Sequence, residues 1–499
     1  MFCITNRRAK FVENHIMSSA IASLEPKAIW ANFDRLNAVP RASKKEETVI
    51  QFIKDFGQNL GLPTEVDPIG NVLIRKPATP GMIGRKTVVM QAHLDMVHQK
   101  NADVDFDFDR QGITMYIDGD WVRAQGTTLG ADNGLGVAAI MGVLASEDLE
   151  HPEIEALFTI DEETGMTGAL ELKPGWLTGA ILLNLDTEED NELGVGCAGG
   201  IDVTFKSCYT PMNNSSKLAY RISVRGLQGG HSGMDIHKGL GNANKIMNRL
   251  LWAIAEMADL SELSGGSLRN AIPRESFGIV AVTPSQERAF KEAFEQSKKE
   301  ILTEFASLEP ELSIALTDCQ PPAEVLPADE FKRFICGIQA TLNGVYRMSP
   351  DIDGLVEASN NLAKVVVKDG LIQWECLTRS SVDSTKWDLV RQLQAVGQLS
   401  GSTVEHSGDY PGWAPNMNSP ILGVMRQIYS DTFGHEPHVA ACHAGLECGI
   451  IGKHYPELDM ISFGPNIRGA HSPDERASIS STQKFWNSLC KTQSEIPER

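Results

Sequence analysis

The sequence predicts an α/β protein with a main domain, built on a central mixed sheet between helices, and an inserted α+β domain. Three observations lead to this prediction. The chain has 499 residues, which is too many for one ordinary core and favours at least two domains. Short apolar segments rich in β-branched residues alternate with an apolar helical segment. The pattern changes after about residue 206 and returns after about residue 411.

The first part of the main domain is expected at residues 25–206. Residues 26–59 carry apolar side chains at helical spacing in two segments, and GLPT ends the second, so two opening helices are predicted. Nearly all-apolar runs predict strands buried on both faces at residues 72–76, 87–97, 153–163 and 180–186. Residues 134–146 predict an apolar helix between them. In such a sheet, functional side chains are expected at the ends of the strands.

The remaining segments complete the domain organisation. Residues 207–404 contain two successive sets of helices and hairpins and are predicted to form the inserted α+β domain. Residues 405–499 return to the earlier pattern and should rejoin the first sheet. Residues 1–24 show no clear periodicity and form an N-terminal extension of uncertain structure. The main domain is therefore expected to be discontinuous in sequence.

Composition excludes several classes of function. Lys and Arg total 45 against 65 Asp and Glu, and the resulting formal charge of −20 would repel a phosphate backbone, which argues against nucleic-acid binding. No segment approaches the roughly 18 consecutive apolar residues of a membrane span. The 9 cysteines include no C-x-x-C pair and predict neither a disulfide framework nor a structural zinc module. We therefore expect a folded cytoplasmic protein with no membrane partner.

Metal-capable residues begin at the second predicted strand. His93 and Asp95 lie near its end, where the two-residue period of a strand puts them on one face. An imidazole there can bind a metal ion while a carboxylate orients its other nitrogen. Asp132 stands among glycines just before the predicted helix. Its simpler alternative role is that of an ordinary N-cap aspartate.

Further candidates follow the later strands. Glu162 and Glu163 end one apolar run, and because neighbours on a strand point in opposite directions, one could bind metal and the other could move protons. Asp186 ends the next run, and His471 follows a strand and a loop containing Gly and Pro. Taken singly, the two glutamates could form a solvated acidic turn, Asp186 could be a turn residue, and His471 could be merely exposed.

The candidates are more specific together than singly. Two histidines and three or four carboxylates at the ends of buried strands form a ligand mixture that suits zinc or cobalt and contains too much nitrogen for calcium. Two divalent ions would be balanced in charge by one bridging hydroxide and three carboxylates, those of Asp132, Glu163 and Asp186. The sequence therefore predicts a site for a pair of metal ions.

Eight short motifs, spaced over most of residues 26–497, closely resemble those of the di-zinc peptidases and deacylases: QAHLDMV, GTTLGADNG, DEETGM, GCAGGID, GGHSG, GGSLRNAIPRE, HAGLECG and GAHSPDE. This group includes carboxypeptidase G, tripeptide aminopeptidase, aminoacylase and succinyl-diaminopimelate desuccinylase. Within the group, the sequence resembles the bacterial aminoacyl-histidine dipeptidases, also called Xaa-His dipeptidases or peptidase D. The resemblance covers nearly the whole chain and implies a zinc-peptidase-like catalytic domain whose inserted domain acts as a lid.

The resemblance implies a role for each metal-capable residue. His93 and Asp186 would bind one zinc ion. Glu163 and His471 would bind the second, and Asp132 would bridge the two. The implied cofactor is two Zn2+ per chain, with Co2+ or Mn2+ as substitutes.

Catalytic and substrate-binding residues are implied in the same way. Asp95 would orient His93, and Glu162 would be the general base that takes a proton from the water and passes it to the leaving amine. The residues implied to bind substrate, each of which could also be purely structural, are His231, Asn270, Arg379, His443 and Glu447. His231 would donate to the carbonyl oxygen, and Arg379 would bind the terminal carboxylate. His443 and Glu447 are four residues apart, the spacing of one helix face.

The implied activity is hydrolysis of unblocked dipeptides through a metal-bridging hydroxide, with Xaa-His and carnosine-like substrates favoured. A homodimer is implied as well, since in many relatives the GGHSG histidine reaches the partner's active site. Whether His231 acts within its own chain or across a dimer stays open. Two alternatives remain: an aminoacylase or carboxypeptidase of the same family, and a non-catalytic peptide-binding protein on the same scaffold. Glu162 argues against the second, since a binding protein needs no base.

Overall fold

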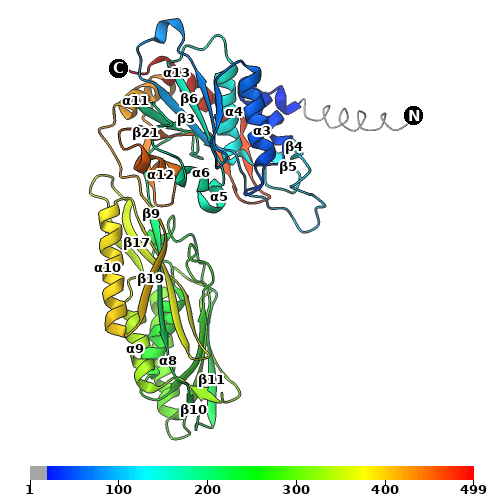
Figure 1. Ribbon diagram of the computed structural model, residues 1–499. Helices are drawn as coiled ribbons and strands as arrows, with labels where there is room; N and C mark the ends of the chain where they lie inside the picture. Colours follow the sequence, from blue (N-terminus) through cyan, green and yellow to red (C-terminus); the bar gives the residue numbers. More distant parts are fainter. Residues whose placement is uncertain (1–19) are drawn as a thin grey trace. The chain divides into compact units, whose positions relative to one another are not determined.

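The computed structural model describes residues 20–499 and consists of two compact units (Figure 1). Unit 1 comprises the residues up to Val195 with Asn416–Ala441 and Ile450–Arg499, and unit 2 comprises Gly196–Pro415 and Cys442–Gly449. Most of the N-terminal extension expected at residues 1–24 lies outside the described residues. The boundaries expected at residues 206 and 404 differ from these, because the strands flanking them pair within the sheet of unit 2.

Unit 1 is built around a mixed sheet, as the sequence predicts. Its strands in spatial order are β1 (Thr64–Val66), β2 (Val72–Lys76), β6 (Ile154–Thr159), β3 (Val88–His93), β7 (Ile181–Asn184), β21 (Asp459–Ser462), β8 (Glu192–Cys197) and β20 (His438–Cys442). The neighbours β6, β3, β7 and β21 run parallel, so their carboxyl ends lie at one edge of the sheet. Every residue of β3, β6 and β7 is buried, as expected for strands covered on both faces.

Helices cover both faces of this sheet. In Figure 1, α3 (Glu47–Asn59) and α4 (Ala131–Ala145) lie on one side of β3 and β6, and α11 (Pro420–Phe433) and α13 (Ile479–Ser494) lie on the other. Because α4 packs between the sheet and α2 (Lys27–Asn37), it is apolar all round and almost entirely buried. The smaller elements are η1 (Pro80–Met82), α5 (Glu162–Gly165), α6 (Thr167–Leu170), α12 (Glu447–His454), whose first residues belong to unit 2, and a sheet of β22 (Ile467–Arg468), β23 (Arg476–Ser478), β5 (Trp121–Ala124) and β4 (Met115–Asp118).

Unit 2 contains a separate antiparallel sheet. Its strands in spatial order are β14 (Ser313–Asp318), β11 (Leu218–Arg225), β13 (Ser276–Val282), β12 (Asp259–Gly265), β17 (Val356–Lys368), β18 (Leu371–Ser380), β9 (Gly199–Cys208) and β19 (Thr403–Tyr410), with β16 (Gly344–Met348) paired to β17. The helices are α7 (Ala243–Ile254), α8 (Glu287–Phe305), α9 (Ala328–Ala340) and α10 (Asp383–Ser400). The short elements are β10 (Met212–Asn213), β15 (Glu324–Val325) and η2 (Ile236–Lys238).

The two sets of helices and hairpins expected from the sequence are the two halves of this sheet. In the first half, the chain order β11, α7, β12, β13, α8, β14 gives the spatial order β14-β11-β13-β12. In the second half, β9, α9, β17, β18, α10 and β19 give the mirrored order β17-β18-β9-β19. The halves join where β12 pairs with β17. The helices and the sheet enclose an apolar core in which Phe205 and Trp374 stack with ring centroids 4.5 Å apart.

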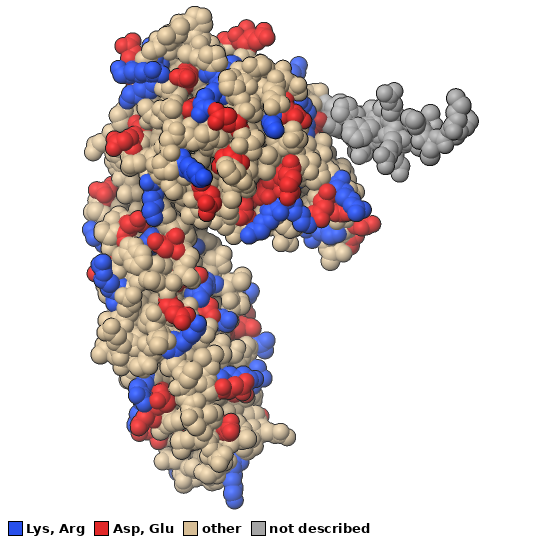
Figure 2. Space-filling view, in the orientation of Figure 1, with Lys and Arg blue, Asp and Glu red and all other residues tan. Residues whose placement is uncertain are grey.

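The surface carries charges of both signs. On the face shown in Figure 2, Lys and Arg side chains are interspersed with Asp and Glu. That face therefore offers no single-sign track for a phosphate backbone. Within residues 20–499, no helix combines the length and the apolar character needed to cross a membrane.

Candidate metal centre

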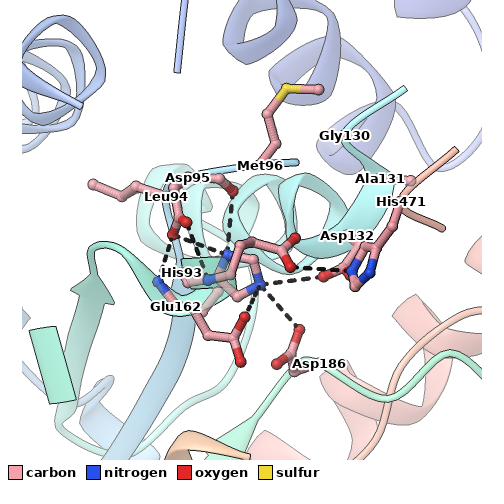
Figure 3. Close-up of polar contacts among 12 residues, drawn as sticks. His93, Leu94, Asp95, Met96, Gly130, Ala131, Asp132, Glu162, Asp186 and His471 are labelled. Carbon is pink, nitrogen blue, oxygen red and sulfur yellow. Dashed lines mark hydrogen bonds and ion pairs between the residues drawn. The ribbon is translucent and has the colours of Figure 1, made fainter. Parts of the chain in front are cut away.

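The metal-capable residues of unit 1 meet at the carboxyl edge of the parallel strands. His93 is the last residue of β3, Asp186 lies two residues beyond β7, and Glu162 opens α5 shortly after β6. Figure 3 shows their side chains converging with those of Asp132 and His471. The prediction that strand ends would bring these residues together thus describes the structure, although they span residues 93 to 471.

Asp132 lies between the two histidines. Its Oδ1 is 3.1 Å from Nε2 of His93, and its Oδ2 is 3.1 Å from Nε2 of His471. Asp186 Oδ1 lies 3.5 Å from the same nitrogen of His93, and Glu163 Oε2 lies 3.0 Å from that of His471. The result is two groups of three residues that share Asp132, and within each group the ligand atoms lie within 4.8 Å of one another.

The electrostatics of the cluster favour positive charge between these side chains. Burial alone would lower the pKa of His93, but the carboxylates of Asp186, Asp132 and Asp95 raise it well above its ordinary value. Hydrogen bonds to Asp132 and Glu163 raise the pKa of His471 to about 11. Burial raises the pKa of Asp186 to about 6 against the opposing effect of His93. The raised pKa values of the two histidines reflect carboxylates crowded around a place that a cation would neutralise.

The donor set fits a pair of divalent cations. It offers two imidazole nitrogens and three carboxylates, a mixture typical of zinc and cobalt rather than calcium. Glu163 Oε1 is buried with no hydrogen-bond partner, so one ligand oxygen is available without breaking another contact. Of the groups found among the described residues, the cluster of Glu46, Asp95 and Asp161 contains no imidazole and is wholly buried. The histidine-containing groups are therefore the candidate centre.

Asp95 contacts both His93 and the backbone of the two glutamates at the start of α5. Its carboxylate is fully buried, and its Oδ1 lies 3.3 Å from Nδ1 of His93. The same carboxylate accepts hydrogen bonds from the backbone N–H groups of Glu162 and Glu163, at 3.0 and 3.2 Å, and from the hydroxyl of Ser43 at 2.8 Å. Asp95 therefore orients an imidazole and anchors the start of α5 at once.

Glu162 occupies a different position from its neighbour. Its Oε2 is 3.9 Å from Nε2 of His93, whereas Glu163 lies within hydrogen-bond distance of His471. The expectation that the pair ends a strand is wrong: β6 ends at Thr159, Asp161 adopts a left-handed φ of 52°, and the two glutamates open the one-turn helix α5. Their side chains diverge because of this turn rather than because of strand alternation.

Asp132 also departs from its expected local structure. The N-cap of α4 is Gly130, with φ of 69°, and Asp132 follows it with φ −79° and ψ 114°, which is not helical. A side chain at Gly130 would collide with the guanidinium of Arg41 and with Met96, so the close approach of those groups requires glycine there. Asp132 is thus not an ordinary N-cap, and the irregular backbone turns its carboxylate toward the histidines.

Sequence reasoning missed two buried ionisable side chains next to this backbone, those of Arg41 and Glu475. The guanidinium of Arg41 donates to the carbonyls of Leu94, Asp95 and Gly130. The carboxyl group of Glu475 accepts from the backbone N–H groups of residues 129–132, at the start of α4. Glu475 stands four residues after His471 in the quoted motif GAHSPDE, which is the one available signal. Nothing local in the sequence distinguishes Arg41 from a surface arginine.

The predicted substrate-binding residues all belong to unit 2. The loops of His231 and Asn270 are joined by a hydrogen bond from Ser232 N–H to the Asn270 carbonyl. Nδ1 of His231 accepts from the N–H groups of Gly233 and Met234, so the neutral ring carries its proton on Nε2 and can donate from there. His231 therefore has the protonation state required of a donor.

Arg379 lies close enough to His443 in unit 2 for its charge to affect the pKa of the histidine. Arg379 donates to the Tyr410 hydroxyl at 3.0 Å, and its buried Nε has no partner. His443 bonds Ser359 through Nε2 at 2.7 Å, and burial together with the charge of Arg379 lowers its pKa to about 3. The helical spacing expected for His443 and Glu447 is wrong, because α12 begins only at Glu447.

Residues 89–492 match the family described as peptidase family M20/M25/M40. The chain is 43% identical over 487 residues to the cytosol non-specific dipeptidase of Escherichia coli (strain K12), an alignment that covers 96% of this chain and all of that protein.

Solved structures of related proteins resemble this chain as well. The aminoacylhistidine dipeptidase of Vibrio alginolyticus superposes with a TM-score of 0.90 at 44% identity, covering 96% of this chain and 98% of that one. The aminopeptidase PepT of Bacillus cereus ATCC 10987 superposes with a TM-score of 0.55 at 16% identity, covering 95% and 99% of the two chains, and shows a shared fold.

Proposed function

Because the chain belongs to peptidase family M20/M25/M40, we propose that it is a metal-dependent dipeptidase whose cluster in unit 1 holds two divalent cations. The observation that carries the proposal is the position of Asp132, whose two oxygens face different histidines at 3.1 Å each. In this proposal His93 and Asp186 hold one cation, Glu163 and His471 hold the other, and Asp132 is shared. Zinc is the proposed metal, with cobalt or manganese as substitutes.

The proposed role of the cations is limited and specific. Two bound divalent cations would lower the pKa of a water molecule toward about 7 and polarise the scissile carbonyl. Other side chains of the protein hold the metal ligands in place and transfer the proton of the attacking water. Asp95, through its contact with His93 Nδ1, keeps Nε2 of that ring directed into the cluster.

Glu162 is the proposed general base. Its carboxylate takes the proton from the attacking water and later gives it to the nitrogen of the leaving amine, so Glu162 ends the cycle unchanged. The contacts of the two glutamates assign the role of base to Glu162 in this proposal. Glu163 Oε2 lies 3.0 Å from Nε2 of His471, which suits a metal ligand, whereas Glu162 Oε2 lies 3.9 Å from Nε2 of His93, beyond hydrogen-bond distance. The hydrogen bond from the backbone N–H of Glu162 to Asp95 holds the start of α5 in place and thereby positions the proposed base.

Unit 2 supplies the proposed substrate ligands. The Nε2–H tautomer of His231 suits a donor to the oxygen on which negative charge develops. Arg379, with its unpartnered buried Nε, suits a carboxylate bound through two parallel hydrogen bonds. The other proposed substrate-binding residues are Asn270, His443 and Glu447.

The proposed substrates are unblocked dipeptides, with Xaa-His and carnosine-like dipeptides among the preferred ones. The similarity to the Vibrio alginolyticus aminoacylhistidine dipeptidase supports the histidine preference, and that to the Escherichia coli cytosol non-specific dipeptidase supports a broader range. The latter name also supports the cytosol as the proposed location. A homodimer is the proposed assembly.

Turnover of a substrate panel tests the proposal. Metal-loaded protein should cleave free Xaa-His dipeptides and leave N-acylated amino acids intact, and chelation should abolish the activity. Glu162→Ala should lower kcat by about 10²- to 10⁴-fold while the metal content stays near two per chain. The matched control is Glu171→Ala, which removes an exposed glutamate outside the cluster and should leave kcat unchanged. Cleavage of only the acylated compounds would show that the substrate class is wrong, and full activity of Glu162→Ala would exclude it as the base.

A further inference from the structure

The side chain of Glu475 accepts hydrogen bonds from four consecutive backbone N–H groups. Its side chain is 2% exposed, and its Oε2 accepts hydrogen bonds from the N–H groups of Leu129 and Gly130 at 2.7 and 2.9 Å. Its Oε1 accepts from those of Ala131 and Asp132 at 2.8 and 3.2 Å. Four consecutive N–H groups, ending with that of the shared ligand Asp132, thus depend on a residue more than 340 positions away.

Arg41 holds the same segment from its carbonyl side. Its guanidinium is 2% exposed and donates to the carbonyl of Gly130 and to those of Leu94 and Asp95, which directly follow His93. Gly130 therefore donates its N–H to the buried carboxyl group of Glu475 and accepts at its C=O from the guanidinium of Arg41, while burial raises the pKa of Glu475 to about 7. Because both its N–H and its C=O are hydrogen-bonded to buried side chains, this peptide has little freedom to rotate, and the bond to the charged guanidinium is the stronger kind.

The loop that carries Glu475 also carries His471. His471 adopts a left-handed φ of 64°, which non-glycine residues rarely adopt without support from their surroundings. Two hydrogen bonds, from Ser472 N–H to the Gly469 carbonyl and from Glu475 N–H to the Ser472 carbonyl, fold residues 469–475 into two consecutive turns, the first of which contains His471. Anchoring Glu475 beneath Asp132 therefore fixes His471 relative to the carboxylate oxygen that it faces.

We propose that Glu475 is a positioning residue of the metal centre: it sets the distance between Asp132 and His471 and thereby the spacing of the two cations. The inference rests on the proposed function, because it assumes that this cluster binds metal. A carboxylate that merely capped α4 would stabilise the helix and leave metal affinity unaffected. Glu475 instead connects two ligand-bearing loops, so its loss should change how tightly, and in what geometry, metal is bound.

The test compares Glu475→Gln with wild type and with a matched control. The glutamine amide presents its NH2 group to two backbone N–H donors, so that half of the interaction is lost while the shape is kept. The control is Glu309→Gln in unit 2, whose carboxylate is also 2% exposed and accepts the N–H groups of Gln228 and Gly241 at 2.9 and 2.8 Å. Both variants should lose thermal stability, and Glu475→Gln should lose more, because two N–H groups rather than one lose their acceptor.

Metal binding separates the two variants. Competition with a chromophoric chelator should show zinc affinity about 10- to 100-fold weaker in Glu475→Gln and unchanged in Glu309→Gln. The visible absorption spectrum of the cobalt-loaded protein should shift only in Glu475→Gln, since it reports ligand geometry. Glu475→Asp, which keeps the charge on a shorter side chain, should show an intermediate affinity and gives the comparison if the glutamine variant does not fold.

The outcomes distinguish this inference from the proposed function. If wild type binds two cations and cleaves dipeptides while Glu475→Gln and Glu475→Asp bind them equally tightly with an unchanged cobalt spectrum, Glu475 is only structural and the inference is overturned. If wild type itself binds fewer than two cations per chain, the proposed function fails first.

Discussion

Replacing Asp95 by asparagine removes one buried negative charge while keeping the shape of the side chain. In the structure, Oδ1 of Asp95 accepts the N–H of Glu162 and lies 3.3 Å from His93 Nδ1, and Oδ2 accepts the N–H of Glu163 and the Ser43 hydroxyl. An asparagine has one oxygen for these donors. The hydroxyl of Ser43 can rotate to accept from the new amide, but a backbone N–H cannot, so one N–H at the start of α5 loses its partner.

The magnitude follows from that count. One buried N–H without a partner costs about 1–3 kcal/mol of folding free energy. Loss of the carboxylate that orients a metal-binding imidazole lowers metal affinity by about 10- to 100-fold, which corresponds to roughly 1.4–2.8 kcal/mol. Asp95→Asn should therefore weaken zinc binding by that factor and lower kcat as well, because α5 also carries the proposed base Glu162.

The assay is chelator competition for zinc together with dipeptide turnover at saturating metal. Glu155→Gln is the matched control: Glu155 is buried as well, at 2% exposure, and accepts the N–H groups of Thr178 and Gly179, but it lies at the opposite end of its strand from the cluster. This control should lose stability and keep its zinc affinity. An Asp95→Asn protein with wild-type zinc affinity and kcat would refute the role given to Asp95.

Two further predictions concern the stability of unit 2. Trp374 is fully buried and stacks on Phe205, so Trp374→Ala should lower the free energy of unfolding by about 3–5 kcal/mol, measured by urea unfolding, and an unchanged midpoint would contradict the packing described. Burial and Arg379 lower the pKa of His443 to about 3, so between that value and about 6.5 the unfolded chain binds more protons than the native one. The stability contributed by neutral His443 should be complete above about pH 6.5 and fall with decreasing pH by at most about 1.4 kcal/mol per unit, and His443→Gln should show a shallower fall than wild type in thermal melts.

The sequence indicated which side chains would meet at the strand ends because its signals are local. The runs around β3, β6 and β7 are almost wholly apolar, which marks strands buried on both faces, and parallel strands present their carboxyl ends at one edge. His93 and Asp186 follow directly from that rule. The two sets of elements in unit 2 were visible for the same reason, since helices and hairpins have distinct periods.

Other features depend on single backbone angles that periodicity does not reveal. Glu162 and Glu163 were expected on a strand, but the left-handed φ of Asp161 ends the extended run and starts α5 instead. His443 was expected one helical turn from Glu447, but the helix starts at the glutamate. In both cases one or two residues change the local structure without changing the apolar pattern.

The sequence reasoning did not find the buried pair of Arg41 and Glu475, for which the one signal is the place of Glu475 in the motif GAHSPDE. Charged residues are usually exposed, and the partners of Glu475 are backbone N–H groups, which every non-proline residue carries. The hydrogen-bonded positions are separated by 343 to 346 residues along the chain. The contacts themselves are a property of the folded backbone, which the apolar pattern of the sequence does not reveal.

The most direct test of the two-cation centre is a titration of the metal-free protein with zinc while cleavage of a free Xaa-His dipeptide is measured. We predict that activity is absent without metal and rises to a plateau at two equivalents per chain, and that His471→Ala abolishes the second binding step. Full activity in protein shown by elemental analysis to hold less than about one-tenth of an equivalent of metal would contradict the assignment of His93, Asp132, Glu163, Asp186 and His471 as its ligands.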